Sequence, residues 1–372
     1  MVQKKIIENK KEDNYKGRLL ERDAHQFLWD LGYLVFPRII LYAIRHKISD
    51  FGENIDKITI TDLDIYGILF GRFLEKNTFL IDCKHRSEQI FSQILRCKGI
   101  STILGINNLL IIRNSVPETV QQFADNFNIR LLNITEFSKR IKKREKGSFN
   151  SKTYVKIDNL FQNMDKSSKT FEVTLSNSYL ETDPFKRIKI LRNLYNLIKH
   201  EINHSKKEEL SELKNYQILQ VFQFALVAIT EIASQTIHLS SYHFKDYIDL
   251  KLIGNLEFKK KIFSKINIIE EAINHEKKQS IPLKILTPSY SDQINELVNE
   301  FRLKPYLLQK YLRFIDFIIH EYFIHKKEIN DIEIKKEFGT VNRNLFAKWN
   351  VKCLEILDDD KLYPIFLTQF LS

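Results

Sequence analysis

The stretch "FLIDCKH" (Phe79–His85) places an acid and a base two residues apart in an otherwise apolar run. Successive side chains of a β-strand point to opposite faces, so Asp82 and Lys84 share one face while Cys83 points to the other. Ionised groups are costly to remove from water, and a buried strand that carries both needs a partner for each charge. The stretch therefore indicates either a structural ion pair or part of an active site.

The residues around this stretch alternate between helical and strand-like patterns as far as about residue 150. Apolar residues at helical spacing predict a first helix that ends at Gly32. We expect strands over residues 33–36, 58–70, 77–85, 107–114 and 129–134, and helices over residues 87–105, 116–128 and 135–146. This order predicts an α/β sandwich built around a central mixed sheet.

The pattern changes after "EKGSFNSKT" (Glu145–Thr153), which has the Gly, Ser and Asn content of a linker. Helical patterns then dominate, at about residues 184–204, 207–239, 257–278, 290–301, 304–326, 328–338 and 342–357. We therefore expect two domains, an α/β domain over residues 1–147 and an all-α domain over residues 148–372.

The composition favours a nucleic-acid partner and an intracellular location. Residues 1–150 hold 25 Lys and Arg against 18 Asp and Glu, and a positive field of this kind attracts a polyanion. The three cysteines, Cys83, Cys97 and Cys353, have neither disulfide nor zinc spacing, which suits a reducing cytoplasm. No signal peptide and no run of 18 apolar residues is visible, so we expect a soluble cytoplasmic protein without a membrane span.

Three carboxylates are expected to meet Lys84 at one edge of the sheet. Asp64 lies in the strand that pairs with "FLIDCKH", Asp82 lies in that stretch, and Glu21 lies on the first helix. Clustered carboxylates need a cation between them, and hard oxygen ligands favour Mg²⁺ or Mn²⁺. Such a metal activates water and a phosphate group, while a nearby lysine orients or deprotonates the water. Asp62 lies on the same face as Asp64, so either of them is a candidate ligand.

These residues and their order resemble the PD-(D/E)xK nuclease superfamily, particularly its Mrr-like restriction endonuclease branch. The resemblance covers about residues 14–140. It includes "GRLLERDAHQFLWDLGYLVF" for the opening helix, "TDLDIYGIL" for the strand with the metal-binding acid, and "FLIDCKH" for the signature strand. The later stretch "LLIIRNSVPETVQQFADNFNIRLLNITEF" resembles the strand–helix–strand that supports the sheet.

The resemblance implies a role for each residue of the cluster. Asp64 and Asp82 would bind the metal together with the backbone carbonyl of Cys83, and Lys84 would position or activate water. Glu21 would assist the metal or its water shell, and Gln89 would lie near the site. The chain would then be a metal-dependent DNA endonuclease of a bacterial restriction or anti-phage defence system. It would act as a homo-oligomer, with the helical domain recognising DNA, mediating oligomerisation or docking onto partner subunits.

Other patterns allow different functions. Arg313 and His320 lie seven residues apart on one helical face, as in ribonucleases of the HEPN type, so RNA cleavage by the helical domain is one alternative. A nuclease-like fold that serves only as a DNA-binding or assembly module is another. "HEINH" (His200–His204) matches the zinc motif HExxH in a highly charged context without an obvious third ligand. The basic residues between Lys139 and Lys146 either follow a DNA backbone or form a solvated helix end.

Overall fold

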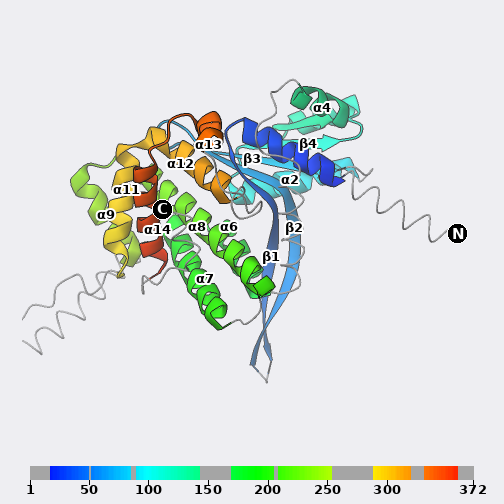
Figure 1. The fold of residues 1–372 in the computed structure, drawn as a ribbon. Coiled ribbons are helices and arrows are strands. Elements are labelled where there is room, and N and C mark those ends of the chain that lie inside the picture. The colour runs from blue at the N-terminus through cyan, green and yellow to red at the C-terminus, as the bar shows by residue number, and fades with distance from the viewer. Residues whose placement is uncertain are drawn as a thin grey trace, which may run out of the picture. The chain divides into compact units, whose positions relative to one another are not determined.

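The protein forms two compact units in the computed structural model (Figure 1). The structure describes residues 17–49, 52–84, 89–142, 169–204, 208–253, 288–319 and 331–358. One unit comprises Met1–Thr182 and Tyr306–Val341, and the other comprises Asp183–Pro305 and Asn342–Ser372. The expected boundary at residue 147 lies outside the described residues. The two units alternate along the chain, because residues 306–341 group with the sheet rather than with the other helices.

The first unit is built on a mixed five-stranded sheet in the order β1-β2-β3-β4-β5. Its strands are β1 (Leu34–Ser49), β2 (Gly52–Phe70), β3 (Lys76–Lys84), β4 (Asn108–Arg113) and β5 (Ile129–Asn133). β2 runs antiparallel to both β1 and β3, whereas β3, β4 and β5 are parallel to one another. The expectation of a mixed sheet flanked by helices and followed by a helical region is confirmed.

The first two strands are much longer than the sequence pattern predicted. They pair continuously from Leu34↔Ile68 to Ser49↔Gly52, with one register shift between Leu41 and Tyr42. Only residues 65–70 of β2 also pair with β3, so most of the hairpin extends beyond the other strands. β1 is an edge strand, and an edge strand tolerates Pro37, which has no backbone N–H to donate.

The first helix covers residues 17–30 and packs closely on the sheet. It ends as predicted at Gly32, whose φ of 92° lies in the left-handed region that glycine adopts without strain. Leu20, Ala24 and Leu28 are buried on its inner face. A side chain at Gly67 of β2 would come within 3.0 Å of Leu28 and 3.1 Å of Tyr33, so this glycine permits the close approach of helix and strand.

The other helices of this unit are α2 (Ile90–Leu104), α3 (Glu118–Asp125), α4 (Ile134–Lys142), α6 (Lys169–Leu180), α12 (Pro305–Ile318) and α13 (Asp331–Phe338). The chain reaches α12 only after α7, α8, α9 and α11 of the second unit, yet α12 binds the turn that follows the first helix and the end of β2. The Gln309 amide donates to the Gly32 carbonyl at 2.6 Å and accepts from the Phe70 N–H at 2.8 Å. The late helix therefore completes the unit that the early residues begin.

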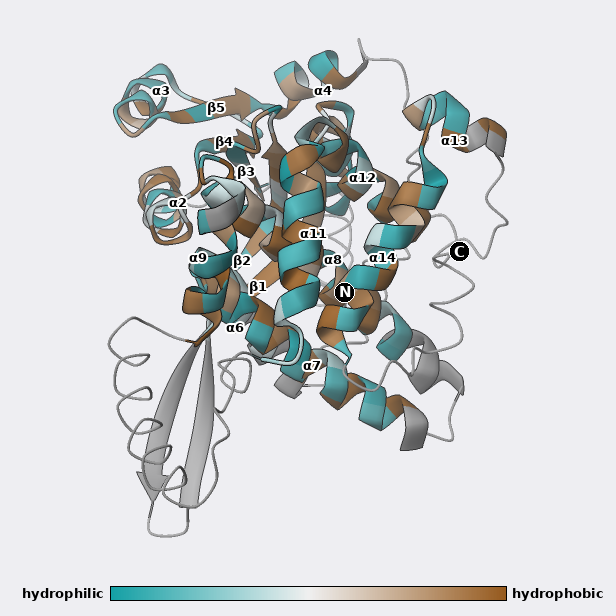
Figure 2. Cartoon of the chain, turned by 90° about the vertical axis from the view of Figure 1, so that its left-hand side faces the viewer, coloured by the Kyte–Doolittle hydropathy of each residue, from teal (hydrophilic) through white to brown (hydrophobic). Residues whose placement is uncertain are grey.

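The second unit is all-helical, with α7 (Pro184–His204), α8 (Glu208–Thr236), α9 (Ser241–Ile253), α11 (Ser291–Leu303) and α14 (Arg343–Leu357). α8 contacts α7, α11 and α14. Hydrophilic and hydrophobic residues alternate along α11, as in a helix with one buried face (Figure 2). Within α8, Lys214–Thr236 is long and apolar enough to cross a membrane, but 94% of its apolar 18-residue window is buried in the protein. Such burial is usual for the core helix of a soluble protein.

Candidate active site

The site lies where β2 separates from β3. The β2–β3 ladder ends at the pair Ile65↔Ile81, while β3 continues beside β4 as far as Lys84↔Arg113. At this point the carboxylate of Asp64 replaces a backbone partner and accepts the N–H of Cys83 at 2.6 Å. Asp64 and Asp82 are both only 4% exposed. Two buried carboxylates, one on each of two adjacent strands, are thus found where the ladder ends.

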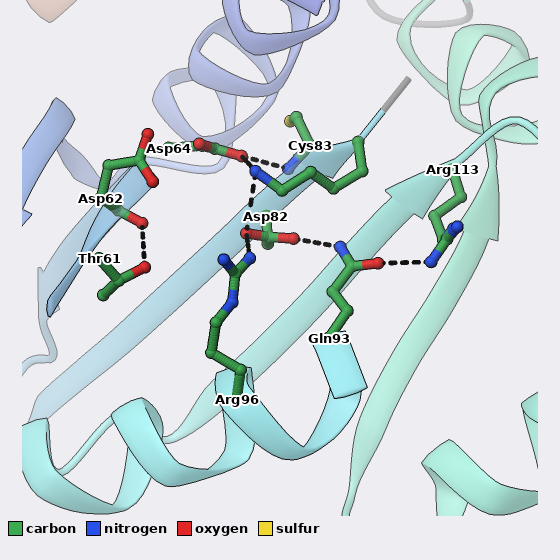
Figure 3. A network of polar contacts seen from close by, with 9 residues as sticks. Thr61, Asp62, Asp64, Asp82, Cys83, Gln93, Arg96 and Arg113 are labelled. Atoms are coloured by element: carbon green, nitrogen blue, oxygen red, sulfur yellow. Dashed lines mark hydrogen bonds and ion pairs between the residues drawn. The ribbon is translucent and has the colours of Figure 1, made fainter. Parts of the chain in front are cut away.

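Lys84 lies between these two carboxylates. Its Nζ is 3.9 Å from Asp64 Oδ2 and 4.0 Å from Asp82 Oδ1, both longer than a hydrogen bond (Figure 3). Burial lowers the pKa of Lys84, but the charges of Asp64 and Asp82 outweigh this effect and raise the pKa above its usual value. Lys84 is therefore an ammonium ion shared by two acids, and in this state it cannot take a proton from water.

The ionised form of Asp64 is disfavoured by its surroundings in the cluster. Burial raises its pKa well above the usual range, and the charges of Asp82 and Glu21 raise it further, against the opposing effect of Lys84. Two like charges this close favour either a bound proton or a cation. Without a cation, Asp64 is thus the acid that holds its proton more firmly than usual.

Asp82 is held from the other side by a chain of polar side chains from α2 and β4 (Figure 3). Gln93 donates its amide N–H to Asp82 Oδ2, and Arg113 donates to Gln93 Oε1 at 2.6 Å. Arg96 donates to Asp82 Oδ1 at 3.3 Å. Gln93 and Arg113 are buried, whereas the Arg96 side chain is 39% exposed. One oxygen of Asp82 therefore faces a buried neutral donor, and the other faces the two cations Lys84 and Arg96.

The structure brings together most of the residues that the sequence singled out. Asp64, Asp82 and Lys84 are in contact, and Glu21, half-buried on the first helix, lies close enough to affect the pKa of Asp64. The side chain of Cys83 is buried, and its N–H is already bonded to Asp64. Its backbone places it between the two acids, where the resemblance puts a carbonyl ligand.

Two further candidates are placed differently. Asp62 shares a strand face with Asp64, but its side chain is exposed, whereas Asp64 is buried against Lys84 and Cys83. The geometry thus favours Asp64 as the ligand. Gln89 is exposed at the start of α2, where its amide oxygen accepts from Ser92 at 3.4 Å. The glutamine that reaches the acids is Gln93, one helical turn later.

The sequence reasoning missed Gln93, Arg96 and Arg113. Gln93 and Arg96 lie three residues apart on α2 and so share a helical face. Arg113 ends an apolar strand, as Lys84 does, and the two residues are paired in register. The sequence places a charged residue at the end of each of these two strands, Lys84 and Arg113. This shared position could have indicated that Arg113 lies near the site.

The donor set fits a hard divalent cation in its chemistry. Asp64 and Asp82 supply carboxylate oxygens, which Mg²⁺ and Mn²⁺ prefer, and their proximity is costly without a cation. Among the described residues, no group of three or more His, Cys, Asp or Glu side chains encloses a metal position by itself. Mg²⁺ commonly binds one or two carboxylates and keeps several waters, so two acids suffice.

The alternative motifs have structural partners. Glu201 of "HEINH" accepts from Lys214 at 2.5 Å. Arg313 donates to the Trp29 carbonyl at 3.1 Å and its guanidinium lies 4.5 Å from the centre of the Trp29 ring, while His320 is outside the described residues. Lys139 and Arg140 are exposed on α4, which ends at Lys142, and the basic residues beyond Lys142 are outside the described residues.

Fold alone does not determine function, so the chemistry has to be argued from these side chains. Comparisons of the chain with protein-family models, with curated proteins and with solved structures gave no match.

Proposed function

We propose that the protein is a metal-dependent DNA endonuclease of the PD-(D/E)xK type, with the restriction-endonuclease-like sandwich as its catalytic unit. The observation that carries this proposal is the shared position of Lys84 between two buried carboxylates of adjacent strands. A structural ion pair would bring one acid to hydrogen-bond distance of one base. Here the single ammonium group of Lys84 lies between two acids, and the pKa of Asp64 is raised. Two acids placed in this way destabilise the fold, but they are suited to binding a cation.

Each residue has a role in hydrolysis of the phosphodiester bond. Asp64 and Asp82 would hold Mg²⁺ or Mn²⁺, with the Cys83 carbonyl as the further ligand that the resemblance implies. When bound, the metal polarises the phosphate and lowers the pKa of a coordinated water. Because its pKa is raised, Lys84 stays protonated, orients the attacking water and stabilises negative charge on the phosphate. Glu21 lies close enough to Asp64 to affect its pKa, and it would accept hydrogen bonds from water bound to the metal.

Two broader features support the proposal. The chain order of helix, antiparallel strands, strand, helix, strand, helix and strand agrees with the order that the resemblance implies. The net charge is +11, and Lys139 and Arg140 are exposed on the sheet unit, which suits a polyanionic substrate. The double-stranded product of a restriction-type reaction requires two active sites, so we include a homodimer or larger assembly in the proposal.

The biological role follows from the resemblance. We place the protein in the cytoplasm as the nuclease effector of a bacterial restriction or anti-phage defence system. The helical unit would recognise DNA, hold two copies together or dock onto partner subunits. If the protein has this role, we expect its activity to depend on a trigger or a partner protein. The first assays should therefore include the products of neighbouring genes.

The proposal is tested by incubating the purified full-length protein, together with the products of neighbouring genes, with plasmid DNA and with RNA, each in Mg²⁺ or in EDTA. We expect DNA cleavage that EDTA abolishes and that Asp82→Ala and Lys84→Ala each reduce by about 10²-fold or more. Asp125→Ala, at an exposed acid of α3, is the matched control and should cleave like the wild type. Asp64→Ala should lose more activity than Asp62→Ala, because only Asp64 is buried against Lys84.

The same experiment distinguishes the alternatives. Cleavage that persists in EDTA, or full activity of Asp82→Ala, would rule out the proposed chemistry. RNA cleavage without metal that is lost in His320→Ala would point to the ribonuclease alternative instead. DNA binding without cleavage, unchanged in Asp82→Ala in the presence of all partner subunits, would indicate a non-catalytic module.

A further inference from the structure

Arg113 is a buried cation at the edge of the candidate site that the proposed chemistry leaves without a role. It is 6% exposed, ends β4 and is the register partner of Lys84 on β3. Residues paired across neighbouring strands lie on the same face of a sheet, so Arg113 shares the face of Lys84 and Asp82. Its guanidinium donates to the amide oxygen of Gln93, which in turn donates to Asp82.

The amide of Gln93 has only one workable orientation between its two neighbours. A guanidinium offers donors and no acceptor, so the amide oxygen has to face Arg113, 2.6 Å away. An ionised carboxylate offers acceptors and no donor, so the amide N–H has to face Asp82. A rotation of the amide by 180° would oppose like groups at both ends. Arg113 therefore fixes which end of Gln93 meets Asp82.

This orientation divides the two oxygens of Asp82 between different tasks. Oδ2 is held by Gln93, which is 3% exposed and packed inside the unit. Oδ1 faces Lys84 at 4.0 Å and Arg96 at 3.3 Å, and the Arg96 side chain is 39% exposed to solvent. Oδ1 is thus the oxygen that can exchange a protein cation for a metal ion while the carboxylate keeps its orientation.

We infer that Arg113 is a positioning residue that sets Asp82 for metal binding through Gln93. The inference rests on the proposed function and adds to it a supporting chain, Arg113 to Gln93 to Asp82, that comes from α2 and β4 rather than from the strands that carry the acids. Supporting groups behind metal ligands typically change metal affinity or activity by about 10–100-fold when they are lost. We expect an effect in this range.

The test measures metal binding apart from cleavage. Mn²⁺ is titrated into the full-length protein and free Mn²⁺ is followed by electron paramagnetic resonance, and separately the Mg²⁺ concentration for half-maximal DNA cleavage is determined. Arg113→Met and Gln93→Met should each weaken Mn²⁺ binding and raise the required Mg²⁺ by about tenfold or more. Arg113→Lys, which keeps one donor, should lie between these variants and the wild type. Combining the two Met substitutions should add little, because both break one chain.

Arg130→Met is the matched control, since Arg130 is an exposed arginine on the neighbouring strand β5, and it should bind Mn²⁺ like the wild type. If Arg113→Met does not fold, Gln93→Met decides by itself. Folded variants that bind Mn²⁺ with wild-type affinity would overturn the inference, and a lower melting temperature alone would assign Arg113 a purely structural role. A wild-type protein that binds no Mn²⁺, or binds it equally in Asp82→Asn, would overturn the proposed function as well.

Discussion

The two units treat buried charge in opposite ways. In the helical unit, Lys199 donates to both oxygens of Asp358 at 2.8 and 2.7 Å, and Arg187 donates to Glu231 at 2.9 Å. In the sheet unit, Lys84 lies 3.9 and 4.0 Å from two acids and reaches neither at hydrogen-bond distance. In a directly hydrogen-bonded pair, the attraction between the two charges offsets much of the free energy lost when they are removed from water. A cation shared between two acids at longer distances offsets less of it. The difference separates charges that hold a fold from charges that are available to a ligand.

The largest expected effect is the loss of one member of a direct pair. In Lys199→Met, Asp358 would stay buried without the Lys199 ammonium, and we expect the free energy of unfolding to fall by about 3–5 kcal/mol. Denaturant unfolding followed by circular dichroism measures this change. Restoring neutrality with Lys199→Met and Asp358→Leu together should recover most of the loss. A single variant as stable as the wild type would contradict the assignment of this pair to the fold.

A smaller effect is expected for Lys84→Met. The variant removes the cation shared by Asp64 and Asp82, but Asp64 can take up a proton instead, because burial already raises its pKa. We expect a loss of roughly 1–3 kcal/mol at pH 7 in EDTA. The loss should shrink near pH 4, where protonation removes the repulsion. Equal losses at both pH values would mean that Lys84 acts through packing rather than through charge.

Removing one of the two acids should have the opposite sign. The pKa of Asp64 is raised by burial and by the Asp82 charge, so the folded protein holds the proton to higher pH than the unfolded chain does. Stability from this group is complete below the usual carboxyl pKa and declines as the pH rises above about 4. Asp64→Asn does not titrate and keeps an acceptor for the Cys83 N–H.

Asp64→Asn should therefore be more stable than the wild type in metal-free buffer, by about 1–2 kcal/mol at pH 7 and by less near pH 4. Unfolding curves across this pH range give the comparison, and Asp62→Asn, at an exposed acid of the same strand, should show no such trend. Added Mg²⁺ should stabilise the wild type more than Asp64→Asn. An Asp64→Asn variant that is less stable at every pH would show that Asp64 serves the fold.

The sequence predicted the acids of the site but not their supports, for physical reasons. Side chains alternate between the two faces of a strand, so Asp82 and Lys84 of β3 lie on one face independently of the rest of the chain. Gln93 and Gln89 lie one turn apart on the same helix, and only the start of α2 at Ile90 decides which reaches Asp82. The residue at which α2 starts depends on how the helix packs against the sheet, and the local sequence pattern holds no information about that packing.

The extent of the fold was predicted unevenly for the same reason. The helices α7, α11 and α14 agree closely with the apolar periodicity, because each has one buried face. The pairing of Gln309 with Gly32 and Phe70 joins residues more than 200 positions apart, so no window of sequence indicates that α12 belongs to the sheet unit. The prediction for β1 ends at Phe36, whereas the strand continues through Pro37, which an edge strand tolerates.

The smallest expected effect concerns a third kind of charge, the partly exposed pair of Lys304 and Glu300. Their hydrogen bond of 2.5 Å lowers the pKa of Glu300, so its stabilising effect is present at neutral pH and lost as the pH falls through the folded pKa. Lys304→Met should cost no more than about 0.5 kcal/mol, since water screens the pair and Lys348 remains near Glu300. Unfolding in low and high salt measures this cost, which should decrease with salt, whereas the cost of Lys199→Met should not. A salt-independent loss above about 1 kcal/mol would place this pair with the direct buried pairs of its unit.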